Sequence, residues 1–338
     1  MKKIINIVSI LVALLAVTTS CETEEHCNKQ KCSEIKFGTA STRAKVESLD
    51  DILDFGVYAQ MSETPDEDYE TQSDIVYTHI LEGAKVARTD KDSNDWDYED
   101  EQYWVNGRTF HFFAYWPSSL ETRIYDDSYQ LDYKTPVTAD DDLLADYYSI
   151  YIDPNFSDYP VVDFTFDRLL TKVRLELEQD WLKNQYDKFW IKSVKLENVK
   201  ADGTLTTSRF DKEGNWYFGE EKFSKEVKYG GDQGLFIKNQ TISPWGGAGV
   251  GLHLIPQPIA LNEIALTLEY DYQQGGQNDQ NAEIKTNVVR ASIPAGEWKA
   301  GNTYTYKVKL YKDNLIVFSN IAVELWGEPL TGGTIIIK

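Results

Sequence analysis

The sequence has few of the residues that most often build catalytic and metal sites. Its 338 residues include 3 cysteines and 4 histidines. Nucleophile-elbow, Walker, HExxH and dinucleotide-binding patterns are all absent. His111 and His253 lie in expected strands, where a surface position or a hydrogen-bonded place in the core is the ordinary role of histidine. We therefore expect a protein that is not an enzyme and that needs no cofactor.

Basic residues are also scarce. Lysine and arginine together number 34, against 55 aspartates and glutamates, and the formal net charge is −21. Nucleic acids are held by clustered lysine and arginine side chains that neutralise the phosphate backbone. The charge therefore argues against a nucleic-acid partner, and it favours solubility and repulsion from other acidic surfaces.

Long apolar runs are missing, apart from one at the N-terminus. Residues 4–17 are apolar except for Asn6 and Ser9, and Lys2 and Lys3 precede them. The run is shorter than the about 20 residues that a membrane-spanning helix needs, and its length is typical of the core of a signal peptide. We predict that residues 1–20 are an export signal.

A cysteine follows this segment directly. Small residues at positions 18–20 run into Cys21, and this arrangement resembles the lipobox of bacterial lipoproteins, in which the thiol takes a diacylglyceryl group. Several acyl chains anchor a protein stably because each buried methylene contributes about 0.8 kcal/mol. The sequence departs from the lipobox pattern at Thr18, where leucine is preferred. Secretion with a free Cys21 is the alternative.

Residues 21–34 are predicted to be a tether. Glutamates follow Cys21 almost at once, which resembles the export tag of surface-displayed lipoproteins of Gram-negative anaerobes; a solvated spacer is the other interpretation. Cys27 and Cys32 either pair in an oxidising compartment or stay free, and no second cysteine or histidine pair follows to complete a zinc site. These features predict a lipid-anchored protein of the outer membrane that is exposed at the cell surface.

The rest of the chain alternates apolar and polar residues with the period of β-strands. Aromatic residues make up 13% of the chain and favour strands over helices. Apolar residues recur at every second position in segments 55–61, 173–177, 264–272 and 304–310. In segment 110–116 both faces are apolar, which predicts an interior strand. Many short strands separated by turn residues are typical of antiparallel sandwiches, so the predicted class is all-β.

The chain length favours two domains, since one core usually serves about 100 to 200 residues. We place the division near Glu178. Short helices are expected only at residues 141–146 and 179–186. A chain reversal is expected at Asp202 and Gly203, a favoured turn dipeptide.

One acidic loop is a weak candidate for calcium. Asp90, Asp92, Asn94 and Glu101 stand at positions one, three, five and twelve of a calcium-loop pattern. The glycine that position six requires is replaced by Asp95, and no helices flank the loop. A solvated hairpin loop is the plainer interpretation, and no other metal site is predicted.

Tryptophans support a rival function. A surface lipoprotein with β-sandwich domains could bind glycans by stacking sugar rings on exposed indoles, although aromatic residues in strands more often belong to the core. The candidates for this role are Trp96, Trp104, Trp216 and Trp245.

Several segments resemble, in family order, those of the fimbrillin or type V pilin family, and together they span nearly the whole mature chain. No single motif is specific, and the resemblance rests on the ordered set. Relatives often carry histidine at the position of Arg168, which we take to be a half-exposed basic residue. The segments are 42–44, 55–59, 110–117, 164–178, 191–199, 254–257 and 293–310.

The resemblance implies two tandem transthyretin-like β-sandwich domains, 35–178 and 179–338, and assembly with other fimbrial subunits into fimbriae that serve cell adhesion. Host or bacterial surface ligands would be further partners. It also implies that a trypsin-like protease cuts after Arg43, leaves Ala44 as the new N-terminus and removes the first strand. A strand from the next subunit then fills the open edge, where it gains main-chain hydrogen bonds and side-chain pockets. The displaced strand is placed at Ile35, Lys36, Phe37 and Gly38.

Both ends of the chain leave alternatives open. An arginine between threonine and alanine is also typical of a solvated loop, and a protein that keeps its first strand would stay a monomeric anchor or adhesin. After Trp326, only residues 335–337 resemble a strand. A C-terminal segment this short offers little strand for a neighbouring subunit to receive, which favours an accessory, tip or anchor subunit over a stalk subunit.

Overall fold

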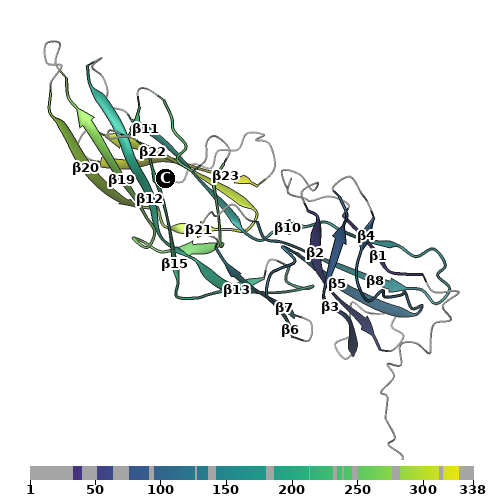
Figure 1. Ribbon diagram of the computed structural model, residues 1–338. Coiled ribbons are helices and arrows are strands. Elements are labelled where there is room, and N and C mark those ends of the chain that lie inside the picture. The colour runs from purple at the N-terminus through teal and green to yellow at the C-terminus, as the bar shows by residue number, and fades with distance from the viewer. Residues whose placement is uncertain are drawn as a thin grey trace, which may run out of the picture.

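The computed structural model shows an elongated molecule with the N-terminal half at one end and the C-terminal half at the other (Figure 1). No helix occurs among the residues it describes, so the all-β prediction is confirmed, and nothing in this part of the chain could cross a membrane as a helix. The described residues are 33–39, 52–63, 76–90, 95–125, 128–135, 142–179, 186–212, 214–230, 234–237, 240–245, 250–275, 282–311 and 315–326.

A six-stranded antiparallel sheet forms most of the N-terminal half. The strand predicted to be interior, β5 (Arg108–Trp116), lies in its middle, between β2 (Asp54–Ser62) and β8 (Leu144–Ile152). Both faces of β5 are buried, as its apolar pattern requires. The sheet is completed by β3 (Tyr77–Arg88), β4 (Trp96–Asp97) and β10 (Asp167–Arg168), in the order β10-β8-β5-β2-β3-β4.

A pair of short strands packs on one face of this sheet. β1 (Lys36–Thr39) runs parallel to β9 (Val161–Phe164). Their inward side chains, among them Phe37 and Phe164, share one apolar core with Phe55 and Phe112 of the large sheet. The first described strand of the chain is therefore part of the N-terminal core.

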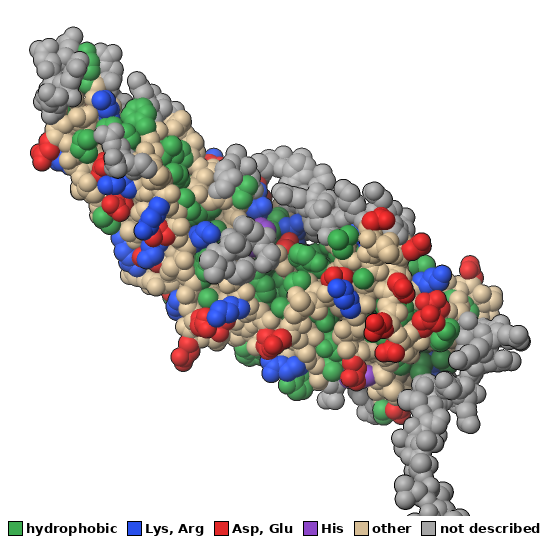
Figure 2. All heavy atoms as spheres, viewed as in Figure 1, with side chains coloured by type: hydrophobic (Ala, Val, Ile, Leu, Met, Phe, Trp, Pro, Cys, Tyr) green, Lys and Arg blue, Asp and Glu red, His purple; other side chains and the backbone are tan. Residues whose placement is uncertain are grey.

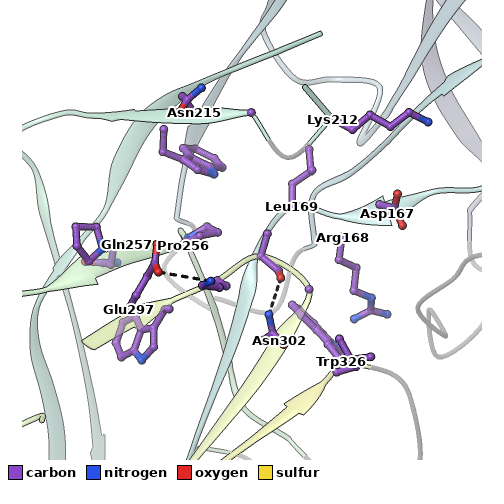
Figure 3. Close-up of a pocket in the computed structure, with 18 of the residues that line it drawn as sticks. Asp167, Arg168, Leu169, Lys212, Asn215, Pro256, Gln257, Glu297, Asn302 and Trp326 are labelled. Carbon is purple, nitrogen blue, oxygen red and sulfur yellow. Dashed lines mark hydrogen bonds and ion pairs between the residues drawn. The ribbon is translucent and has the colours of Figure 1, made fainter. Parts of the chain in front are cut away.

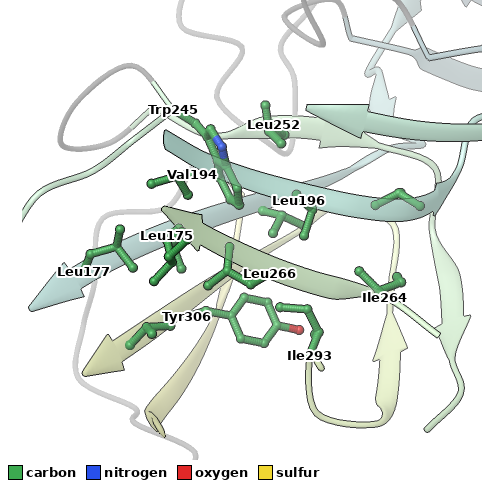
Figure 4. Close-up of a cluster of buried hydrophobic side chains, with 14 of the residues drawn as sticks. Leu175, Leu177, Val194, Leu196, Trp245, Leu252, Ile264, Leu266, Ile293 and Tyr306 are labelled. Carbon is green, nitrogen blue, oxygen red and sulfur yellow. The ribbon is translucent and has the colours of Figure 1, made fainter. Parts of the chain in front are cut away.

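The C-terminal half is a sandwich of two sheets around a second core (Figure 4). Leu175 and Leu177 project from one sheet toward Leu196 and Leu266 of the other. One sheet has the order β17 (Leu252–Leu254), β11 (Thr171–Gln179), β22 (Asn302–Tyr311), β23 (Leu315–Leu325). The other sheet has the order β15 (Lys222–Lys228), β12 (Lys188–Lys200), β19 (Ala265–Gln273), β20 (Ile284–Ser292). The short strand β16 (Leu235–Phe236) also pairs with β12. Strands β18 (Gln257–Ile259) and β21 (Gly296–Trp298) form a separate pair.

A further sheet joins the two halves. Its order is β14 (Asn215–Phe218), β13 (Asp202–Ser208), β7 (Ser128–Lys134), β6 (Thr122–Tyr125). β13 and β7 pair along their whole lengths, although about seventy residues of chain separate them. A third core, which includes Phe113, Leu131, Leu205 and Ile255, lies against this junction sheet. The halves are thus linked by hydrogen-bonded strands and by shared apolar packing.

The strand pairings of β11 concern the position of the boundary between the two domains. Val173 of β11 belongs to the C-terminal core, and β11 pairs with β22 in parallel and with β17 in antiparallel orientation. The division near Glu178 stays a prediction. We propose to move it to the chain before Thr171, because β11 packs with the second half.

Two local predictions were wrong. Residues 144–146 begin strand β8 instead of a helix, because Leu144 and Ala145 are buried and pair with Trp116 and Tyr115 of β5. The Asp202–Gly203 dipeptide opens β13 instead of reversing the chain, and the chain passes there from one sheet to another. Most of the helix predicted at residues 179–186 lies outside the described residues.

Candidate functional site

The first described segment of the chain is held on both sides by backbone hydrogen bonds. Residues 36–39 pair with residues 161–164 of β9 on one side. On the other side the Ile35 amide donates to the Gln102 carbonyl at 2.8 Å, and the Trp104 amide donates to the Ser33 carbonyl at 3.0 Å. Segment 33–39 thus occupies a slot between β9 and residues 102–104.

Alternate side chains of this segment enter the core, as expected for a strand with one buried face. Ile35 and Phe37 are 0% and 3% exposed, whereas Lys36 between them is exposed. The Phe37 ring lies 5.1 Å from the Tyr98 ring, edge to face, and 6.0 Å from Phe112. Burying an apolar side chain of this size contributes roughly 1.5–3 kcal/mol, so this strand is a substantial part of the N-terminal core.

Tyr98 closes the slot from the side. Its hydroxyl donates to the Ile35 carbonyl at 2.9 Å and accepts from the Gln102 amide at 3.0 Å. Burial raises the pKa of Tyr98 to about 12, partly offset by the backbone hydrogen bond from Gln102. The phenol is therefore a neutral donor at physiological pH, as its bond to a carbonyl oxygen requires.

Glycine at position 38 permits the close approach of β1 to β9. A Cβ atom there would collide with the carboxylate of Asp163 and lie 3.3 Å from Val161. The strand predicted to be displaced, Ile35 to Gly38, therefore lies in a fitted slot. Cys21, Cys27, Cys32, Arg43 and Ala44 lie outside the described residues.

The calcium candidates are only partly described. Asp90 and Glu101 are exposed, and the Glu101 carboxylate accepts a hydrogen bond from the Tyr103 hydroxyl at 2.9 Å. Asp92 and Asn94 lie outside the described residues. In the described part of the chain, no group of three or more histidine, cysteine, aspartate or glutamate residues could hold a metal ion.

Two of the tryptophans proposed as sugar platforms belong to the core. Trp104 is 2% exposed and Trp245 is 7% exposed, so neither presents a ring face to solvent, and for them the prediction was wrong. Trp96 is half-buried and packs 4.9 Å from the Phe55 ring. Trp216 is half-buried on β14 and lines a cleft.

This cleft opens where the two halves meet, and its volume is about 670 Å³ (Figure 3). The lining comes from β10, β14, β18 and β21, together with Trp326 at the end of β23. The sequence did not predict the cleft, because strands far apart in the chain form its walls. Of its lining residues, only Trp216 was named from the sequence as a candidate ligand contact.

A buried ion pair lies beside the cleft. Arg168 Nη1 lies 3.1 Å from Asp142 Oδ2, and the Arg168 guanidinium lies 4.2 Å from the centre of the Trp326 ring. Burial raises the pKa of Asp142 to about 6, although the Arg168 charge opposes this. Arg168 is 6% exposed, so the expectation of a half-exposed residue was wrong. Its carboxylate partner comes from the N-terminal half and its aromatic partner from the end of β23.

His111 is a hydrogen-bonded core residue, which is one of the two ordinary roles expected for it from the sequence. Its Nδ1 lies 2.8 Å from Ser149 Oγ, and its Nε2 contacts the Arg209 guanidinium. Burial lowers the pKa of His111 to about 3, and the Arg209 charge adds to the effect. Because arginine only donates, Nε2 must accept and Nδ1 must carry the proton. This histidine is thus oriented to donate to Ser149 and cannot accept the serine proton through Nδ1.

Comparison with known proteins decides the family. The model of the fimbrillin-like family matches residues 42–326, most of the chain. The chain belongs to the fimbrillin-like family. No curated protein matches the chain. As a fimbrillin-like protein, it has a role related to fimbriae, and the resemblance predicted from its ordered segments is confirmed.

One solved structure supports the fold of this fimbrillin-like chain, and others are similar to it at lower scores. A fimbrial protein from Bacteroides vulgatus is similar with a TM-score of 0.64 at 17% identity, and the match covers 87% of this chain and 100% of that one. A candidate cell adhesion protein from Bacteroides uniformis has a TM-score of 0.47 at 15% identity, with 89% and 100% covered. A candidate cell adhesion protein from Parabacteroides distasonis has a TM-score of 0.48 at 11% identity, with 89% and 99% covered.

Proposed function

We propose that this fimbrillin-like protein is a surface-exposed lipoprotein that serves as a structural or accessory subunit of fimbriae and joins other subunits by strand exchange. The observation that carries the proposal is the slot occupied by segment 33–39. A short strand that contributes two buried side chains, and that pairs on both sides, leaves a complementary acceptor when it is removed.

Removing the strand would expose both edges of the slot. The Gln102 carbonyl and the Trp104 amide would lose their partners, and so would the backbone of β9. An unmade buried hydrogen bond costs about 1–3 kcal/mol, and the apolar hole left by Ile35 and Phe37 adds to this cost. A strand from another subunit with apolar residues at alternate positions restores both kinds of contact, which is the driving force for assembly.

In this proposal a trypsin-like protease supplies the trigger by cutting after Arg43. The cut leaves Ala44 as the new N-terminus and separates β1 from the rest of the protein. Before the cut, a lipid on Cys21 holds the protein at the outer membrane through the tether. Within the fimbria, we propose an accessory, tip or anchor position for this subunit.

The proposal is tested by digesting purified protein comprising residues 21–338 with trypsin and sequencing the new N-terminus. We expect Ala44 as the N-terminus and a ladder of SDS-resistant oligomers on unheated gels. The matched control is Arg43→Ala, which keeps every other lysine and arginine and should give neither product. Cleavage at other sites without a ladder would contradict the proposal.

A further inference from the structure

The cleft between the two halves has the size and position of a ligand site. Its volume of about 670 Å³ lies within the about 300–1,000 Å³ that is usual for ligand clefts, which often form where two structural units meet. We propose that it binds a carbohydrate chain, a function separate from strand exchange. The cleft offers an aromatic surface, and the charges around it balance each other.

The aromatic surface comes from the edge strand of the junction sheet. Trp216 and Phe218 of β14 are half-buried and line the cleft together. Behind Trp216, the Tyr133 ring lies 6.4 Å away at 79° and belongs to the third core. Trp298 and Trp326 also line the cleft, but their exposed fractions are 1% and 5%. Trp216 therefore offers a partly exposed ring at the cleft that packs edge to face against Tyr133.

Polar side chains also line the cleft. Asn215 borders it, but this residue precedes Trp216 on β14, so its side chain projects from the opposite face of the strand, where it donates to the Asp211 carboxylate at 3.2 Å (Figure 3). Lys212 and Glu297 are exposed on the rim, with Lys212 Nζ 3.5 Å from Asp146 Oδ1. The rim of the cleft thus presents both a hydrogen-bond donor, Lys212, and an acceptor, Glu297, to a bound molecule.

The charges around the cleft balance each other. Asp167 and Glu297 contribute negative charge, Lys212 and Lys299 contribute positive charge, and Lys299 Nζ lies 3.9 Å from Glu297 Oε2. The buried Arg168 is paired with Asp142. An anionic ligand would select clustered arginine and lysine, and a cationic ligand would select unpaired carboxylates. The balance favours a neutral ligand.

A neutral ligand that needs both an aromatic face and many hydrogen-bonding groups is a sugar. The face of an indole ring is electron-rich and attracts the weakly positive C–H groups on one side of a pyranose ring. The hydroxyls at the ring edge then meet the polar rim. Gln257 takes no part in this, because its amide is buried and donates to the Ile255 carbonyl while its oxygen accepts from the Lys200 amide.

The test is calorimetric titration of the uncleaved protein with four trisaccharides: mannotriose, maltotriose, galactotriose and chitotriose. We expect at least one to bind, and we expect Trp216→Ala to weaken that binding about ten-fold, the effect of losing one stacked ring. The matched control is Tyr217→Ala. Tyr217 adjoins Trp216 on β14 but is 65% exposed and lines a different cleft, so its removal should leave the affinity unchanged.

Folding is checked by circular dichroism of each variant. If Trp216→Ala does not fold, Trp216→Phe and Glu297→Ala replace it, since the first keeps a ring against Tyr133 and the second changes an exposed residue on the rim of the cleft. Weakened binding in both replacements supports the site. The proposal is overturned if none of the four trisaccharides binds, or if Tyr217→Ala weakens binding as much as the cleft variants do.

Discussion

Replacement of Phe37 by alanine tests whether β1 is held by its side chains. Phe37 is 3% exposed, and its ring contacts those of Tyr98, Phe112 and Phe164 at centroid distances of 5.1, 6.0 and 6.1 Å. Replacing a buried phenylalanine by alanine costs about 3–5 kcal/mol through lost burial and the cavity that remains. We expect a loss of free energy of unfolding in this range.

The measurement is equilibrium urea denaturation followed by circular dichroism, with Lys36→Ala as the matched control. Lys36 is the adjacent residue of the same strand but is exposed, so its replacement should change the free energy of unfolding by less than about 0.5 kcal/mol. A fluorescent peptide with the sequence of residues 33–39 should also enter the slot faster in Phe37→Ala. Equal stabilities for the two variants would refute the reasoning.

Three further predictions concern the ion pair, the slot and the anchor. Arg168→Met leaves the Asp142 carboxylate buried without its partner and should lower the free energy of unfolding by about 3–5 kcal/mol, as measured by urea denaturation. The pKa of Tyr98 is raised from 10.0 to about 12 in the folded state, so its contribution to stability is complete below pH 10 and is lost as pH rises toward 12. The free energy of unfolding of Tyr98→Phe should therefore depend less steeply on pH between pH 10 and 12 than that of the unchanged protein. Cys21→Ser should move the protein from the membrane fraction to the soluble fraction of cells, and unchanged fractionation would count against lipid anchoring.

Strands with one buried face could be predicted from the sequence. Alternation at residues 264–272 predicted β19, in which Leu266, Leu268 and Tyr270 are fully buried. The apolar character of both faces at residues 110–116 predicted the central place of β5. In these segments the periodicity records burial directly, because side chains alternate between the faces of a sheet.

The junction between the halves could not be predicted in this way. Tyr133 and Gly203 pair across the junction sheet, but the residues around each of them do not indicate which strand it pairs with. The leucines near residue 144 lie beside several aspartates, and only pairing with β5 makes that segment a strand. Arg168 was expected to be half-exposed, because its partners Asp142 and Trp326 are distant in sequence. Long-range pairing thus overrides local propensity in the region that forms the cleft.

Hydrogen exchange at the Trp104 amide and at the amides of β9 tests the central proposal most directly. These groups line the slot, and the Trp104 amide donates to Ser33 in the uncleaved protein. We expect slow exchange before cleavage after Arg43, fast exchange in the cleaved monomer at high dilution, and slow exchange again in the SDS-resistant oligomer. Exchange at Trp104 that stays slow in the cleaved monomer, or stays fast in the oligomer, would contradict the proposal.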